Sequence, residues 1–178
     1  EGKTLQAIQK DASSLKAVSK ERIRDEFVKI IMADDAEEGL RALEEAGLLV
    51  YALPELRDGI GVEQNLHHVY TVFEHNIRAL AYAVRKKYSL EVRLASLLHD
   101  VGKPQTKRGQ GKYATFYGHD VVGSRIAARA LERLRFSKDV IEKVVLLVRH
   151  HLFYYNVGEV TASSGRRLLR HVGPENIH

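Results

Sequence analysis

Apolar residues recur at intervals of three and four along most of the chain, the spacing of one face of an α-helix. In residues 4–16 this spacing places Leu5, Ile8, Ala12 and Leu15 on one stripe. Ser19 is suited to cap a second helix that Asp34–Asp35 end, and Gly47 to close a short third helix. Further helices are expected at roughly 66–85, 89–99, 118–135, 138–152 and 163–171.

One segment lacks this helical spacing. The stretch TKRGQGKYATFYGH has two glycines around a turn, followed by alternating Tyr113, Thr115 and Tyr117. Alternation is typical of extended backbone, so residues 112–117 are expected to form a small β-hairpin or an extended loop. The pattern as a whole predicts an all-α fold, a helical bundle with at most this one exception.

The composition narrows the class of protein. The 178 residues suffice for one compact core, and the absence of cysteine excludes disulfides and thiolate metal sites. We therefore expect a reducing, cytoplasmic location. No stretch reaches the roughly 20 apolar residues of a membrane span, and no secretory signal precedes the first helix. A net charge of +5 is compatible with an anionic partner such as a nucleotide or RNA. Because the chain opens on Glu1, we expect it to be a piece of something longer.

The stretch LASLLHDVGK, residues 94–103, ends an apolar helix on polar side chains. His99 and Asp100 are adjacent at its tip, where the second residue can turn back so that both reach one ion. Burying an aspartate there is costly unless a cation or several donors compensate. The pair therefore indicates a metal site more strongly than a lone histidine does.

Three other predicted helices also carry histidines. The stripe of His68, Thr71, Val72, His75 and Ala79 would turn His75 inward, and a stripe ending on His151 would turn His150 outward. His119 stands at the start of a predicted helix, directly after Gly118. It would serve either as a metal ligand or only as the cap of that helix. His151 would contact an ion or a phosphate. If no metal binds, each of these residues would simply be a core histidine that is hydrogen-bonded to a backbone carbonyl.

The expected ligands are His75, His99, Asp100, His119 and His151. Nitrogen and oxygen donors without sulfur suit Zn, Mn, Fe, Co or Ni, whereas Mg would favour more carboxylates. Lys103, about one turn further on, would bind a phosphate or act as a C-terminal cation on the helix dipole. Lys107, Arg108 and Lys112 would guide an anionic substrate or only keep an exposed loop in solution.

EHNIRAL and LLHDVGK resemble the first two signatures of the HD phosphohydrolase superfamily, whose metal ligands follow the order H…HD…D. The resemblance implies an all-helical fold and hydrolysis of phosphomonoesters or phosphodiesters with divalent metals. By this resemblance, His75 takes the first position and His99–Asp100 the second. His119 and His151 occupy places comparable to two further histidines that hold a second metal in some members. Asp100 and Lys103 would then take part in catalysis.

A narrower resemblance spans nearly the whole chain. SKERIRDEFVKII, GLRALEEAGLLVYALPEL, HHVYTVFEH and LVRHHLFYY resemble the carboxy-terminal half of bacterial tRNA nucleotidyltransferases of the CCA-adding and poly(A) polymerase type. This implies a helical neck over residues 1–60, which helps to hold tRNA, and an HD domain over 61–178. The catalytic head is absent. The last metal aspartate is expected beyond His178, and Thr71 stands where relatives often carry an aspartate. Asp120 lies too early to replace the missing one.

Three functions remain open. The first is a metal-dependent phosphohydrolase domain acting on a nucleotide or on an RNA end. The second is an HD-fold scaffold that binds tRNA and retains a vestigial metal site. The third is a structural or oligomerisation domain. We expect no membrane partner and leave a homodimer open.

Overall fold

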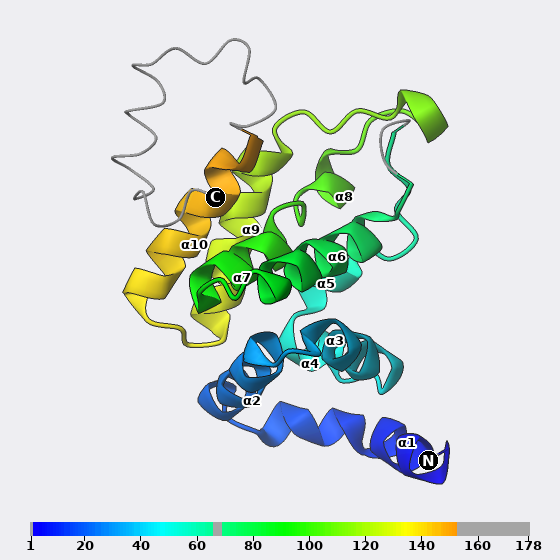
Figure 1. The fold of residues 1–178 in the computed structure, drawn as a ribbon. Coiled ribbons are helices and arrows are strands. Elements are labelled where there is room, and N and C mark those ends of the chain that lie inside the picture. The colour runs from blue at the N-terminus through cyan, green and yellow to red at the C-terminus, as the bar shows by residue number, and fades with distance from the viewer. Residues whose placement is uncertain (1, 66–68, 153–178) are drawn as a thin grey trace.

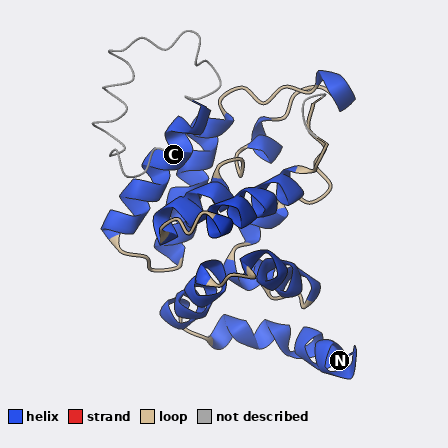
Figure 2. Ribbon diagram, in the orientation of Figure 1, coloured by secondary structure: helices blue, strands red, loops and turns tan. Residues whose placement is uncertain are grey.

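The computed structural model describes residues 2–65 and 69–152, and within them all regular elements are helices (Figure 2). No residue pair in these ranges forms a named strand, which confirms the all-α class. The elements are α1 (Gly2–Asp11), η1 (Ala12–Ala17), α2 (Lys20–Met32), α3 (Ala36–Glu45), α4 (Leu49–Ala52), α5 (Pro54–Arg57), α6 (Val72–Arg85), α7 (Leu90–Leu98), α8 (Lys103–Thr106), η2 (Gly111–Tyr113), α9 (His119–Arg133) and α10 (Lys138–His150). The helix expected at 163–171 lies outside the described residues.

Two helices differ from the sequence prediction. The first ends at Asp11 and continues as a 3₁₀ segment, η1, that contains Ser13 and Ser14. Serine hydroxyls compete with the backbone for hydrogen bonds, which disfavours a continuous helix. The helix expected from Leu66 begins instead at Val72, because the Thr71 hydroxyl accepts a hydrogen bond from Glu74 N at 3.2 Å and caps it.

The later start of α6 also changes which of its residues are inside. Its buried face runs through Phe73, Ile77 and Leu80, whereas Thr71, His75 and Ala79 are only half-buried. Of the stripe that was expected to point into the core, Val72 is buried, whereas Thr71, His75 and Ala79 lie beside the buried face. His75 lies at the edge of the buried face, where its ring stays accessible.

The segment around residues 112–117 is an extended loop rather than a hairpin of two strands. Arg108 and Thr115 exchange two backbone hydrogen bonds of 2.9 Å, which form one isolated antiparallel bridge. A short 3₁₀ turn, η2, lies between them. The alternation of tyrosine and threonine thus marks extended backbone, but only a single residue pair is joined.

One hydrophobic core joins α2 and α3 to α6, α7, α9 and α10. It contains Phe27, Ile31 and Leu40 from α2 and α3 together with residues of α6, α7, α9 and α10. In Figure 1 the N-terminal helices lie at the bottom and α6–α10 pack above them. Arg93 of α7 links the upper helices to the N-terminal ones, because its buried guanidinium donates a hydrogen bond to Ile31 O at 3.1 Å. No helix in the described ranges is long and apolar enough to cross a membrane.

Candidate metal centre

The tip of α7 brings His99 and Asp100 to the same place. The helix ends at Leu98, and a turn follows in which Lys103 N donates to Asp100 O at 2.9 Å. This turn directs the Asp100 carboxylate back toward its neighbour, so that His99 Nε2 lies 3.2 Å from Asp100 Oδ2. Asp100 is only 1% exposed. The apolar helix therefore does end on a buried carboxylate.

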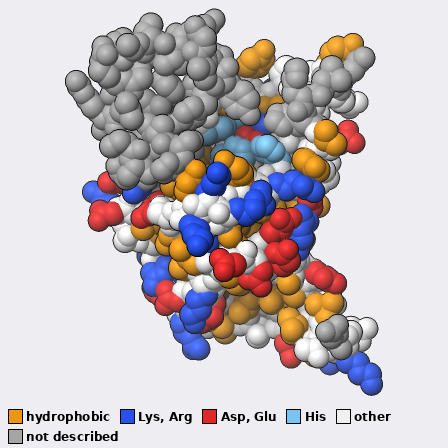
Figure 3. Space-filling model, in the orientation of Figure 1, with side chains coloured by type: hydrophobic (Ala, Val, Ile, Leu, Met, Phe, Trp, Pro, Cys, Tyr) orange, Lys and Arg blue, Asp and Glu red, His pale blue; other side chains and the backbone are white. Residues whose placement is uncertain are grey.

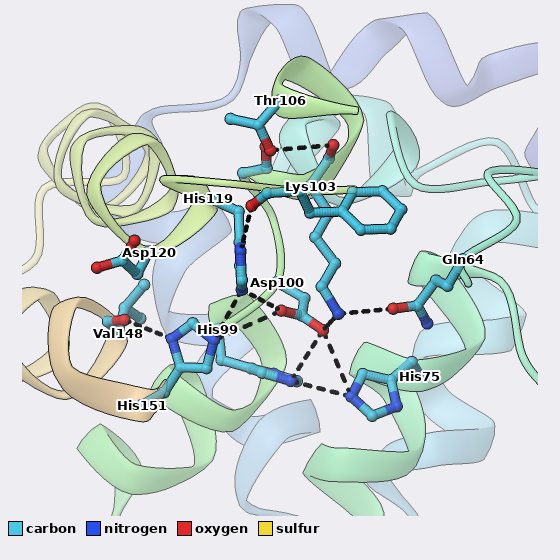
Figure 4. A network of polar contacts seen from close by, with 12 residues as sticks. Gln64, His75, His99, Asp100, Lys103, Thr106, His119, Asp120, Val148 and His151 are labelled. Atoms are coloured by element: carbon cyan, nitrogen blue, oxygen red, sulfur yellow. Dashed lines mark hydrogen bonds and ion pairs between the residues drawn. The ribbon is translucent and has the colours of Figure 1, made fainter. Parts of the chain in front are cut away.

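Four imidazoles surround this carboxylate (Figure 4). His75 Nε2 and His99 Nε2 lie 3.4 and 3.2 Å from Oδ2, and His119 Nε2 and His151 Nε2 lie 3.2 and 3.5 Å from Oδ1. The rings come from α6, the end of α7, the start of α9 and the end of α10. The structure thus brings together all five residues that the sequence predicted as ligands.

Hydrogen bonds on the far side of three rings decide which nitrogen faces the carboxylate. Nδ1 of His99, His119 and His151 lies 2.7–2.8 Å from the backbone oxygen of the residue three positions earlier. A carbonyl can only accept, so each Nδ1 carries the proton and each neutral ring turns the lone pair of Nε2 inward. Histidines that bind metals are commonly held this way.

The Nε2 atoms lie close to one another as well as to Asp100. The two Nε2 atoms of His119 and His151 are 3.1 Å apart, as are those of His75 and His99. In the first pair, neutral rings have no proton to share, because both protons sit on Nδ1. A metal ion between them would satisfy both lone pairs at once.

The ligand spacing fits a shared ion. Two nitrogens bound about 2.0–2.1 Å from one metal at angles of about 90–110° are about 2.9–3.4 Å apart. The separations of 3.1 Å between nitrogens and of 3.2–3.4 Å from His75, His99 and His119 to the carboxylate lie within this range, and the 3.5 Å of His151 lies just above it. The described residues contain two ligand groups that share Asp100: His75–His99–Asp100 and Asp100–His119–His151.

The electrostatics of Asp100 also favour a cation. Burial by itself raises the pKa of this carboxyl, but the charge of His99 and hydrogen bonds from His119, His151 and His99 hold the pKa well below its usual range. That lowering belongs to rings protonated on both nitrogens; when the rings are neutral with Nε2 lone pairs, a metal ion would have to supply the same positive charge. Although Lys103 is near, Asp100 Oδ2 receives no hydrogen bond of good geometry from any described residue. The site thus holds a carboxylate that stays ionised and lacks a full set of donors.

Lys103 lies inside the cluster and not at its rim. Its Nζ is 2.7 Å from Asp100 Oδ2 and donates to Gln64 Oε1 at 2.6 Å, and the residue is buried. Gln64 comes from the loop before α6 and was missed by the sequence analysis, since that loop has no periodic pattern that could single out the residue. Lys107 donates to Glu63 O at 2.7 Å on the outside of the same loop.

Among the described residues, two other candidates lie apart from the cluster. Asp120 forms an ion pair with Arg149 and joins neither ligand group, as the sequence order suggested. His150 is exposed, next to the half-buried His151, so the predicted inward and outward orientations are confirmed. His67 and His68 lie outside the described residues, and the side chain of Lys112 is not among those described.

Close backbone packing holds the two halves of the site together. A Cβ on Gly102 would stand 2.3 Å from His119 O and 2.5 Å from Gly123 N. Only glycine lets the turn after Asp100 approach the start of α9 so closely. A cavity of about 600 Å³ opens over the cluster and includes Asn65, Phe116, Tyr117 and Leu152 in its lining. Figure 3 shows histidine side chains together on this face.

Residues 72–171 match the HD domain family. Because this match covers more than half of the 178 residues, the chain belongs to the HD domain family. Residues 1–60 match a second family, described as the probable RNA and SrmB-binding site of polymerase A. The two regions together match part of the CCA-adding tRNA nucleotidyltransferases, which confirms the resemblance seen in the sequence.

Similar proteins carry tRNA nucleotidyltransferase names. The chain is 37% identical over 161 residues to an A-adding tRNA nucleotidyltransferase of Deinococcus radiodurans, which covers 85% of the chain and 37% of that protein. It is 40% identical over 138 residues to a CC-adding tRNA nucleotidyltransferase of Thermus thermophilus, covering 75% and 32%. A multifunctional CCA protein of Neisseria meningitidis is 30% identical over 156 residues, covering 86% and 37%. The chain therefore spans about a third of the length of these relatives.

Proposed function

We propose that the chain is a metal-dependent phosphohydrolase domain that cleaves phosphomonoesters or phosphodiesters of nucleotides or RNA ends. One observation carries the proposal: the Nε2 lone pairs of His99, His119 and His151 converge on a buried carboxylate, with their protons held on the opposite nitrogens. Such a set of donors suits a divalent cation, and the family match supports a metal site.

In this proposal the two oxygens of Asp100 serve two ligand pairs. Oδ2 faces His75 and His99, and Oδ1 faces His119 and His151, so the carboxylate would bridge two adjacent positions. Zn, Mn, Fe, Co or Ni suits these donors better than Mg. A bound divalent ion supplies hydroxide at neutral pH and neutralises charge on the phosphate oxygens.

Lys103 is the residue we assign to the phosphate. Its ammonium already lies against Asp100, beside the cavity, and a buried cation near the reacting group stabilises the negative charge of a phosphoryl transition state. Gln64 holds the ammonium from the other side and so fixes its direction. The chain's own contribution is therefore to orient the carboxylate and to present one fixed positive charge.

The second part of the proposal concerns RNA. We propose that residues 1–60 are a neck that helps to hold tRNA and that residues 61–178 are the HD domain. The match of residues 1–60 to an RNA-binding region supports this division. The names of the similar proteins support a parent that is a tRNA nucleotidyltransferase, adding CCA or poly(A).

Hydrolysis assays test the first part. Protein stripped with chelator and reloaded with Mn²⁺, Co²⁺, Ni²⁺, Zn²⁺ or Mg²⁺ is offered nucleoside monophosphates, cyclic nucleotides and short RNAs. We expect release of phosphate or ring opening with at least one transition metal and loss of it in His151→Ala. The adjacent His150→Ala is the matched control, because His150 is exposed. Equal activity in the two variants, or none with any ion, contradicts the proposal.

One observation favours a second candidate, the tRNA-binding scaffold without catalysis. The Lys103 ammonium supplies an internal cation to Asp100, which is what a buried carboxylate needs when no metal is bound. A scaffold predicts RNA binding that weakens steeply with salt and does not respond to divalent metal at the site. Gel-shift titrations of wild type and His99→Ala/Asp100→Ala across salt concentrations, together with the hydrolysis assays, distinguish the two, since the scaffold binds RNA equally in both proteins and hydrolyses no substrate with any ion.

A further inference from the structure

Tyr117 is an exposed aromatic side chain on the wall of the cavity over the cluster. It is 86% exposed, although its neighbours Phe116 and His119 are 8% and 7% exposed. No described residue makes a hydrogen bond or a ring contact with it. An apolar ring thus stands in solvent beside a polar site, between anchored residues.

The backbone around Tyr117 fixes where the ring stands. Gly118 has a φ of +74°, the left-handed region that favours glycine, and it turns the chain into α9. The His119 Nδ1–H donates to Phe116 O at 2.7 Å and closes the loop across Tyr117. Because the loop is held at both sides, presenting the ring to a ligand costs little conformational entropy.

We propose that Tyr117 is a base-stacking platform, so that the substrate is a nucleotide or the terminal nucleotide of an RNA whose unstacked base lies on this ring. The inference rests on the proposed function and names its substrate class. Only Gly118 separates Tyr117 from the proposed ligand His119, so the Cα atoms of the two residues are at most about 7 Å apart. A phosphate cannot stack on an aromatic ring, whereas every nucleic-acid base has a flat face that can.

The position of Tyr117 relative to the positive charge of Lys103 supports the same proposal. Lys103 Nζ lies 2.7 Å from Asp100 Oδ2 and 5.5 Å from the centroid of the Phe116 ring. Lys103 and Tyr117 both line the cavity over the cluster, so a cation for the phosphate and an aromatic residue for the base belong to one cavity. This pairing of charge and aromatic ring is typical of proteins that bind single nucleic-acid strands.

A binding experiment tests the platform without hydrolysis. The chain contains no tryptophan, so Tyr117→Trp introduces a single fluorophore at the proposed stacking position. Adenosine monophosphate is expected to quench its emission in a saturable manner, and ribose 5-phosphate, which lacks the base, is expected to leave it unchanged. Equal quenching by both, or none by either, overturns the inference. Failure of hydrolysis alone would leave this measurement intact.

Kinetics on the metal-loaded protein give the second measurement. Tyr117→Ala is expected to raise KM for a nucleotide substrate about 5- to 150-fold with little change in kcat, the range measured for loss of one stacked base. Tyr117→Phe is expected to keep the wild-type KM. Inhibition by inorganic phosphate should not change, and Tyr113→Ala, an exposed tyrosine of the same loop, is the control. A nucleotide KM that Tyr117→Ala leaves unchanged, or a phosphate affinity that falls equally, contradicts the platform.

Discussion

Replacing Lys103 with methionine removes one charge from the cluster while keeping the length of the side chain. The ammonium lies 2.7 Å from Asp100 Oδ2, and the residue is 6% exposed. At an effective dielectric constant of about 20, the attraction across that distance is about 6 kcal/mol. Desolvation of the ammonium offsets part of it, and breaking a buried pair typically costs about 3–5 kcal/mol.

We therefore expect Lys103→Met to lower the free energy of unfolding by about 3–5 kcal/mol in the presence of chelator. For a chain of this size that corresponds to a fall in Tm of about 6–20 °C. A divalent ion at the site would supply the missing positive charge. Adding Mn²⁺ or Zn²⁺ should restore most of the lost Tm, and it should raise the variant's Tm more than that of wild type.

Urea unfolding and thermal melts, each with chelator and with metal, check this expectation. Lys107→Met is the matched control: Lys107 is half-buried and its Nζ donates to a backbone oxygen, that of Glu63, and not to a buried carboxylate, so a loss below about 1 kcal/mol is expected. If Lys103→Met loses the same stability with and without metal, the ammonium does not stand in for an ion. If it loses none, the buried pair is energetically neutral and the reasoning is refuted.

Three further predictions follow from individual contacts. Gly102→Ala should destabilise the protein by about 3 kcal/mol or more in urea unfolding, because the new Cβ would meet the backbone of His119; a smaller loss would contradict the tight packing. Asn76→Leu should raise stability by about 1–2 kcal/mol, since both polar atoms of this buried amide lack partners among the described residues; a loss in Tm would show that Asn76 is satisfied. Arg41→Ala should cost about 1 kcal/mol at neutral pH, because the partly exposed guanidinium joins α3 to Glu74 of α6. The hydrogen bond from Arg41 lowers the pKa of Glu74, so this contribution is present above the ordinary value of 4.5 and is lost as pH falls below it, and unfolding curves of wild type and variant should converge in acid.

The ligands of the candidate site could be named from the sequence because each sits at a position where local chemistry is informative. His99 and Asp100 end an apolar helix, and a carboxylate there needs a partner. His151 follows a regular apolar stripe, and its inward orientation comes directly from helical spacing. These residues could be predicted because their placement follows from the spacing and the ends of a single helix.

The surroundings of the ligands could not be predicted, because they depend on contacts between distant segments. Gln64 meets Lys103 across 39 positions, and nothing in its own loop indicates this partner. The expected roles for Lys103 were a phosphate contact about one turn from the ion or a cation at the helix end, and neither included the direct ion pair with Asp100 that the fold forms. The start of α6 was misplaced because one threonine cap outweighed the apolar pattern before it.

The metal content of protein purified without chelator tests the central claim most directly. Elemental analysis should find a transition metal in wild type and in His150→Ala, and little or none in His151→Ala and His99→Ala/Asp100→Ala, with each variant's folding checked by circular dichroism. Equal metal content in all four proteins, or none in any of them even after dialysis against Mn²⁺ or Zn²⁺, would contradict the account.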